Sequence, residues 1–146
     1  MLALIADDLT GAGDASVQFA KRGWDVFLAL DVRLKPDTTE NSVVALTTDS
    51  RALTNDAAQQ LTFDALRTLM DAGADRVFLK IDSTMRGSVR GQVGGALDAW
   101  RTRHPDARAV VCPAYPRMGR TVAAGRLLVH GQPVDRTAIG RDPVTP

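Results

Sequence analysis

The chain has 146 residues, of which 45% are hydrophobic and 24% charged, and its formal net charge is +1 at pH 7, as expected for one soluble globular domain over residues 1–146. The small net charge argues against a nucleic-acid partner, and no apolar run is long enough to span a membrane, so we expect neither kind of partner. The single cysteine excludes an internal disulfide and favours a cytoplasmic location.

The N-terminal part of the chain predicts two strands around one helix. Residues 2–6 form an apolar run that predicts a buried strand, and the glycine-containing segment 7–13 predicts a polar turn. A helix is expected over residues 14–22, ending at Gly23, where glycine favours a helix C-terminus. Residues 24–30 predict a second strand.

A polar loop at residues 33–42 then leads into a third strand at 43–47. A longer helix is expected to begin near Thr54 or Asn55, both good N-caps, and to stop at Gly73. Its apolar residues recur at spacings of three and four, which predicts one buried face. These residues are Ala58, Leu61, Ala65 and Leu69.

The second half predicts two more strands, one helix and a hairpin. A fourth strand is expected at 76–81 and a fifth at 108–112, where Cys112 would be a buried thiol and Pro113 would end the strand. Between them an apolar stripe of Val89, Val93, Ala96, Leu97 and Trp100 predicts a helix ending near Arg103. Residues 126–134 predict a short hairpin, and the tail from residue 142 an extended segment.

Strands that alternate with helices are typical of an α/β fold with a parallel sheet. We therefore expect a Rossmann-like three-layer domain, with a mostly parallel sheet of about five strands and a short C-terminal hairpin. Ligands of such sheets bind outside the carboxyl ends of the strands.

Polar residues follow four of the five predicted strands at these ends. They are Asp7 and Asp8 after the first strand, Ser50 and Arg51 after the third, Lys80, Asp82, Ser83, Thr84, Arg86 and Gly87 after the fourth, and Arg120 beyond the fifth. Arginine and lysine bind carboxylates or phosphates, aspartates accept hydrogen bonds from hydroxyls, and glycine lets backbone approach a ligand. The set predicts a pocket for a small polyhydroxylated anion.

A structural interpretation of single members of this set stays open. Ser83 and Thr84 could cap a helix, and Asp82 could pair with Lys80 or Arg86. Other motifs fail on spacing. No GxxxxGK[ST] phosphate loop is present, and the segment 11–13 lacks the third glycine of a dinucleotide fingerprint.

Six segments, in order, resemble the N-terminal domain of the four-carbon acid sugar kinase family. They are IADDLTGAGD (5–14), TDSRAL (48–53), KIDSTMRG (80–87), CPAYPRMGRT (112–121), GRLLVHGQPV (125–134) and RDP (141–143). The resemblance covers nearly the whole chain. It implies a Rossmann-like domain that holds a small sugar acid of the threonate or erythronate type for phosphorylation by ATP.

The resemblance also implies roles for the residues of the predicted pocket. Asp8 and Asp82 are the candidates for a catalytic base. The substrate-binding candidates are Asp7, Ser50, Arg51, Lys80, Ser83, Thr84, Arg86, Gly87 and Arg120. Two positions depart from the family pattern: Gly13 stands where threonine is common, and Gln92 where glutamate is common.

In the family, ATP and Mg²⁺ are bound mainly by a separate C-terminal nucleotide-binding domain, and residues 1–146 resemble only the N-terminal domain. We therefore expect no cofactor to bind this chain alone, and weak or no substrate binding without turnover. The nucleotide-binding domain would be a partner in cis or in trans, and self-association is possible. The alternatives are a stand-alone binding or regulatory module and a decayed remnant that lost catalysis.

Overall fold

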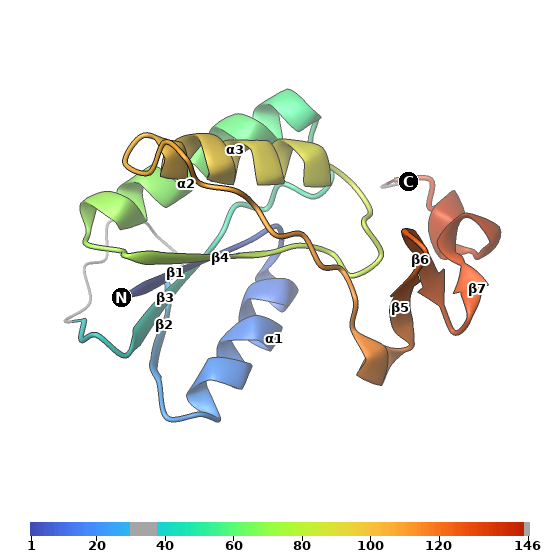
Figure 1. Ribbon diagram of the computed structural model, residues 1–146, viewed down its shortest axis with the longest axis horizontal. Helices are drawn as coiled ribbons and strands as arrows, with labels where there is room; N and C mark the ends of the chain where they lie inside the picture. Colours follow the sequence, from blue (N-terminus) through green and yellow to red (C-terminus); the bar gives the residue numbers. More distant parts are fainter. Residues whose placement is uncertain (30–37, 145–146) are drawn as a thin grey trace.

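The structure is a computed structural model that describes residues 1–29 and 38–144 (Figure 1). The predicted loop at 33–42 lies partly outside these residues, as do the last residue of the predicted second strand and residues 145–146 of the tail. Among the described residues, no helix has the length and apolar character needed to cross a membrane.

A parallel sheet of four strands forms the middle layer. Its strands are β1 (Leu2–Ala6), β2 (Asp25–Ala29), β3 (Ser42–Thr47) and β4 (Arg76–Lys80), in the order β2-β3-β1-β4. β1 lies between β3 and β4 and is almost completely buried, as its apolar sequence predicts. β4 is only partly buried, because no strand among the described residues pairs with its outer edge.

Three helices cover the two faces of the sheet, which confirms the predicted three-layer α/β fold (Figure 1). Helix α1 (Leu9–Ala20) packs on the face that carries Leu4 and Ala6 of β1. Helices α2 (Asn55–Asp71) and α3 (Val89–Arg101) pack on the opposite face, which carries Ala3 and Ile5. Alternate residues of one apolar strand therefore reach two separate cores.

Helix α1 begins earlier than the sequence predicted. It starts at Leu9 and not at residue 14, because the side chain of Asp8 caps it and Oδ1 accepts a hydrogen bond from the Gly11 amide at 2.6 Å. The predicted polar turn is therefore mostly the first turn of this helix. Helix α2 has the predicted N-cap, Thr54, and ends before Gly73.

The predicted apolar face of α2 was partly wrong. Ala58 and Leu69 are buried as expected, but Leu61 is 43% exposed and Ala65 is only partly buried. The buried face also includes Thr62, Leu66 and Met70. The observed buried face is therefore rotated about the helix axis relative to the predicted one. The sequence pattern missed this because Thr62, a polar residue, occupies a central position of the buried face.

Three glycines spaced four residues apart bring α3 and the segment before it against the backbone of α2. A Cβ atom at Gly87 would lie 2.1 Å from the Arg51 carbonyl oxygen, and at Gly91 2.0 Å from that of Asn55. At Gly95 the distance to the Gln59 carbonyl oxygen would be 2.2 Å. The contact leaves no room for a side chain at these three glycine positions.

The predicted fifth strand is wrong. Residues 108–112 form neither helix nor strand, and no backbone hydrogen bond joins 108–114 to another described residue. Cys112 is exposed, so it is not the buried strand thiol that the sequence predicted. The segment runs alongside β4 (Figure 1) but a cavity lined by both keeps the two backbones apart.

Residues 115–144, here called the C-terminal module, form a small antiparallel sheet and three 3₁₀ turns. The strands are β5 (Arg120–Ala123), β6 (Arg126–Val129) and β7 (Gln132–Pro133). The predicted hairpin is confirmed by β6 and β7, whereas β5 was missed. Both connections contain two residues with positive φ, Ala124-Gly125 and His130-Gly131, as two-residue hairpin turns require.

Candidate functional site

The parallel register brings three strand ends to one edge of the sheet. Ala6, the last residue of β1, lies opposite Thr47 of β3 on one side and Lys80 of β4 on the other. The polar segments that follow these residues therefore meet, as the sequence predicted for parallel strands. A backbone hydrogen bond from the Ser50 amide to the Asp7 carbonyl oxygen, 3.0 Å long, continues the β1–β3 contact beyond the sheet.

Arg51 is held by two carboxylates from the end of β1. Its Nε donates to Oδ2 of Asp7 at 2.7 Å, and its Nη1 lies 2.8 Å from Oδ2 of Asp8. Burial would lower the pKa of Arg51, but the hydrogen bond that Arg51 donates to Asp7 and the charges of the nearby carboxylates raise it. Asp7 is buried and its Oδ1 has no hydrogen-bond partner among the described residues.

Arg86 is held by a second pair of carboxylates. Its Nε donates to Oδ2 of Asp82 at 2.9 Å, and its Nη1 donates to Oδ2 of Asp142 at 3.0 Å. The hydroxyl of Thr84 donates a short hydrogen bond to Asp82. Burial would raise the pKa of Asp82, but the hydrogen bonds from Arg86 and Thr84 outweigh it and lower the pKa to about 2.

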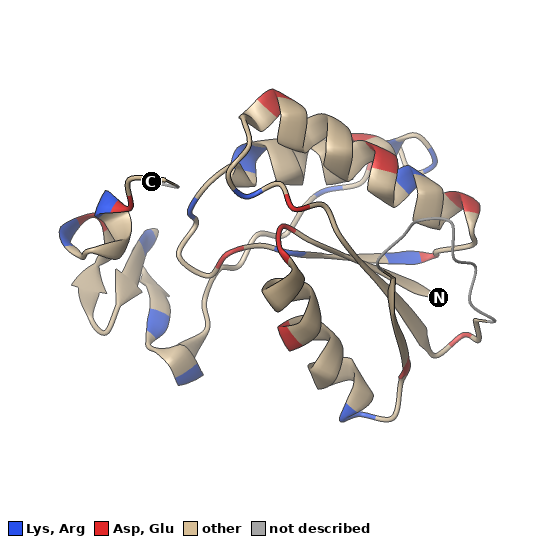
Figure 2. Ribbon diagram, turned by 180° about the vertical axis from the view of Figure 1, so that it is seen from behind, with Lys and Arg blue, Asp and Glu red and all other residues tan. Residues whose placement is uncertain are grey.

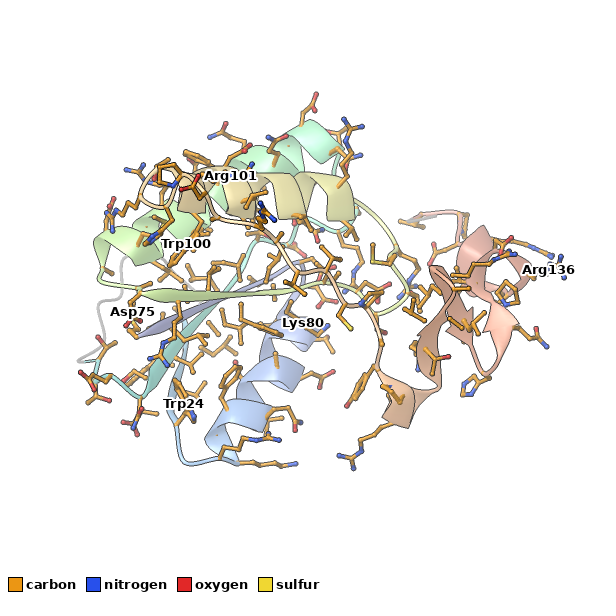
Figure 3. The ribbon with its side chains drawn as sticks, in the orientation of Figure 1. Trp24, Asp75, Lys80, Trp100, Arg101 and Arg136 are labelled. Atoms are coloured by element: carbon orange, nitrogen blue, oxygen red, sulfur yellow. The ribbon has the colours of Figure 1, made fainter. Side chains whose placement is uncertain are left out.

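Lys80 provides a third cation between the two arginines in the sequence. Its Nζ donates to the Ile81 carbonyl oxygen at 2.8 Å. The side chain lies close to Gly11 in the first turn of α1, where a Cβ atom would be 3.6 Å from Nζ (Figure 3). An ammonium group has three donors, so two remain after this bond.

A buried hydrogen-bond network supports the site from behind. The hydroxyl of Ser88, the N-cap residue of α3, donates to the Ser50 carbonyl oxygen at 2.6 Å. The Gln92 side chain donates to Ser88 Oγ at 3.0 Å. All three side chains are buried. The sequence did not single out Ser88, although serine directly before a helical apolar stripe is a cap signal that could have found it.

The strand ends open into a cavity of about 1290 Å³. Seven of the eleven predicted site residues line it, namely Asp8, Arg51, Lys80, Asp82, Ser83, Arg86 and Arg120. The other four do not: Asp7, Ser50 and Thr84 are buried behind it, and Gly87 is packed against Arg51. Acidic and basic segments gather at this edge of the sheet in Figure 2.

Ser83 and Thr84 do not cap a helix, because α3 begins at Val89. The pairing of Asp82 with Arg86 that the sequence left open is present. Arg120 lies in the C-terminal module on the far side of the cavity, and its buried Nε has no hydrogen-bond partner among the described residues. That N–H could donate to a bound anion.

No group of three metal-ligating side chains occurs in the described part of the chain. The cluster at the strand ends is instead a mixed one, in which arginines and aspartates neutralise each other and leave N–H donors at the cavity. Such a cluster suits an anion that also carries hydroxyl groups.

Comparison with protein families gives one match over nearly the whole chain. The model of the sugar-binding N-terminal domain family matches residues 2–146. The D-threonate kinase of Bordetella bronchiseptica is 40% identical over 99% of this chain, and the D-erythronate kinase of Heliobacterium modesticaldum is 37% identical over 98%. The chain spans only 36% and 32% of these two kinases.

Solved structures have the same fold. A domain of unknown function from Bordetella bronchiseptica, crystallised as a domain-swapped dimer with bound citrate, superposes with a TM-score of 0.90 at 40% identity and covers 99% of this chain and 36% of that one. A Salmonella typhimurium protein described as a putative tRNA synthase superposes with a TM-score of 0.82 at 28% identity, over 99% of this chain and 35% of its own.

Proposed function

The chain belongs to the family of sugar-binding N-terminal domains, and from this premise we propose that it is the substrate-binding domain of a kinase that phosphorylates four-carbon sugar acids. The supporting relatives are kinases named for D-threonate, D-erythronate and 3-oxo-tetronate. A stand-alone module or decayed remnant is less favoured. The pocket residues that match the motifs of the acid sugar kinase family are present, and their side chains form an ordered cluster of ion pairs at the cavity.

The observation that carries the proposal is the arrangement of Arg51, Lys80 and Arg86 on one cavity. Each cation is oriented by acceptors from the protein, yet each keeps N–H groups that are not fully used by the described residues, such as Arg86 Nη2, whose contact with Asp82 is 3.5 Å long. A substrate carboxylate can accept these remaining bonds. The citrate bound in the Bordetella structure, like a sugar acid, is a hydroxyl-bearing carboxylate anion.

The two candidate bases differ in their surroundings. Asp82 has a pKa lowered to about 2 and is held by Arg86, so it is a weak proton acceptor and is better suited to orienting that guanidinium. Asp8 lines the cavity but caps α1 and pairs with Arg51. We assign Asp8 the role of accepting a hydrogen bond from a substrate hydroxyl and retain it as the candidate base.

The nucleotide and Mg²⁺ would be bound mainly by a partner domain, in cis or in trans. The nucleotide supplies the phosphoryl group, while this chain binds and orients the acceptor hydroxyl. We expect no ADP release by the isolated chain with D-threonate and ATP in a coupled assay.

The proposal is tested by calorimetric titration of the chain with D-threonate, D-erythronate and D-threitol. Threitol carries the same hydroxyl arrangement as threonate without the carboxylate, so binding of the acids but not of threitol supports an anion site. Lys80→Met should weaken binding at least tenfold, whereas the exposed Lys21→Met should leave it unchanged. Equal affinity for threitol, or no effect of Lys80→Met, would contradict the proposed site.

Self-association of this chain is a separate proposal. The Bordetella structure is described as a domain-swapped dimer. Sedimentation equilibrium of this chain over a hundredfold concentration range will show whether it also forms dimers, and a constant monomer mass would exclude this.

A further inference from the structure

The cavity is larger than a four-carbon acid requires. Small-molecule sites usually have volumes of about 300–1,000 Å³, whereas this cavity has about 1290 Å³. The predicted site residues occupy only its polar end, at the carboxyl ends of the strands. The rest runs along β4 as an apolar groove, lined by Val77, Phe78 and Leu79 of β4, Phe19 of α1, and Leu97 and Trp100 of α3.

Two unpaired backbone edges border this groove. On one side is the outer edge of β4, the last strand of the sheet among the described residues. On the other side is the segment 108–112, which has no backbone hydrogen bond to the described chain. Unpaired backbone groups at a sheet edge favour the addition of another strand, because that strand supplies the missing donors and acceptors.

The side chains beside the groove are apolar and unusually exposed. Phe78 on β4 is 42% exposed, and Val110 and Val111 on the opposite segment are 95% and 48% exposed. Valine and phenylalanine favour strands. Several exposed apolar side chains that lie next to one another indicate a surface that another chain covers. A helix or a small ligand would cover the side chains but leave both backbone edges unpaired.

The charge around the cavity indicates the character of the occupant. Apart from the predicted site residues, the charged residues of its lining are Arg22, Arg108 and Arg117 against one carboxylate, Asp14. The C-terminal module, which borders the cavity through Tyr115, Arg117, Met118 and Arg120, carries basic segments in Figure 2. An apolar strand flanked by acidic residues would complement this lining.

We propose that the groove between β4 and residues 108–112 binds one extended strand of the nucleotide-binding domain, with an apolar centre and acidic flanks. This inference rests on the proposed function, because it takes the partner to be the remaining part of a sugar-acid kinase. The relatives have about two thirds of their length outside the region that this chain matches. The inserted strand would pair with β4 and with 108–112, so that the latter becomes the strand that its sequence favours.

Proline substitutions test the pairing directly. In an extended segment, consecutive N–H groups point to opposite sides, so only one of Val110 and Val111 can donate into the groove. Proline removes the N–H and costs no hydrogen bond in the free chain, since neither residue makes one. We therefore expect one of Val110→Pro and Val111→Pro to weaken binding at least tenfold, and the other to weaken it much less. Val110→Ala and Val111→Ala control for loss of the side chains.

The probe is the part of the Bordetella D-threonate kinase that follows the matched region, purified separately and checked for folding by circular dichroism. Binding to this chain is measured by calorimetry, and per-residue amide exchange by NMR. We expect the probe to protect alternate amides of β4. Failure of the folded probe to bind, or equal binding by both proline variants, overturns the proposal.

Two further outcomes also decide the assignment. In the absence of the probe, the protection of β4 amides could rise with the concentration of this chain. That result would identify a second copy of the chain as the occupant of the groove and would overturn the proposal. Titration with D-threonate separates the inference from the proposed function, because the proline substitutions lie outside the polar end of the cavity. Acid binding that persists while the strand fails to dock would refute the inference alone.

Discussion

Arg86 and Asp142 form an ion pair of 3.0 Å although they are 56 residues apart in the chain. The pair joins the C-terminal module to the loop after β4. Arg86 therefore links the edge of the sheet that carries the proposed site to the position of the module.

Asp142→Asn should loosen the C-terminal module without unfolding the sheet. The variant removes the charge that holds Arg86, while Asp82 still orients the guanidinium. We expect faster amide exchange in residues 115–144, with exchange in β1 unchanged. Asp135→Asn is the matched control, since Asp135 lies in the same module and pairs at 3.8 Å with exposed Arg126. Equal effects of the two substitutions would contradict the link.

Asp82 should make the stability of the protein depend on acid pH. Its pKa is lowered from 3.8 to about 2 in the folded state. A lowered folded pKa stabilises the protein above pH 3.8, and this contribution of about 2 kcal/mol is lost as the pH falls through 2. Urea unfolding between pH 5 and pH 2 should therefore be less pH-dependent in Asp82→Asn than in the parent chain.

The exposed Asp64→Asn serves as the control for this measurement, and it should retain the parent's slope. If Asp82→Asn kept the full acid dependence, a lowered pKa of Asp82 would not be its source.

Gly95→Ala should destabilise the protein, whereas Gly94→Ala should not. A Cβ atom at Gly95 would lie 2.2 Å from the Gln59 carbonyl oxygen, so the two helices would have to separate. At Gly94 the nearest atom is 3.6 Å away in the Gln59 side chain, an ordinary contact. Alanine is favoured over glycine in a helix by about 1 kcal/mol. The free energy of unfolding should thus fall for Gly95→Ala and rise slightly for its neighbour.

Arg51→Met should cost about 3–5 kcal/mol, because it leaves the buried carboxylate of Asp7 without its charged partner. Adding Asp7→Asn should recover much of this loss in the double variant. Arg103→Met removes the exposed pair with Asp71 and should cost about 1 kcal/mol or less. Chemical denaturation of the parent chain and the three variants gives these differences, and a small effect of Arg51→Met would contradict the cost assigned to the unpaired carboxylate of Asp7.

The sequence predicted the strands of the parallel sheet better than the helix start and the segment that flank it. The strands β1 and β3 are continuous apolar runs, which a buried parallel strand requires, and their ends carry the polar residues that meet at the site. The start of α1 was misplaced because Asp8 was interpreted only as a ligand, although the same carboxylate can cap a helix.

Residues 108–112 show where local pattern was insufficient. Their composition favours a strand, but a strand exists only where a neighbouring edge pairs with it, and that depends on what lies between the segment and β4. The burial of Asp7 and Ser50 could not be predicted either, because it depends on tertiary contacts with Arg51 and Ser88. The catalytic and substrate-binding roles of the eleven candidates remain predictions.

The contact between Gly87 and Arg51 has a consequence for the evolution of specificity. The two segments that carry the arginines of the site touch through backbone, since a Cβ atom at Gly87 would lie 2.1 Å from the Arg51 carbonyl oxygen. The separation of these two segments is thus set by main-chain contact at Gly87 and not by the volume of a side chain there. A shift of preference among acids of different length or stereochemistry should therefore arise from exchange of the side chains that line the cavity, while the separation of the two arginine-bearing segments stays constant.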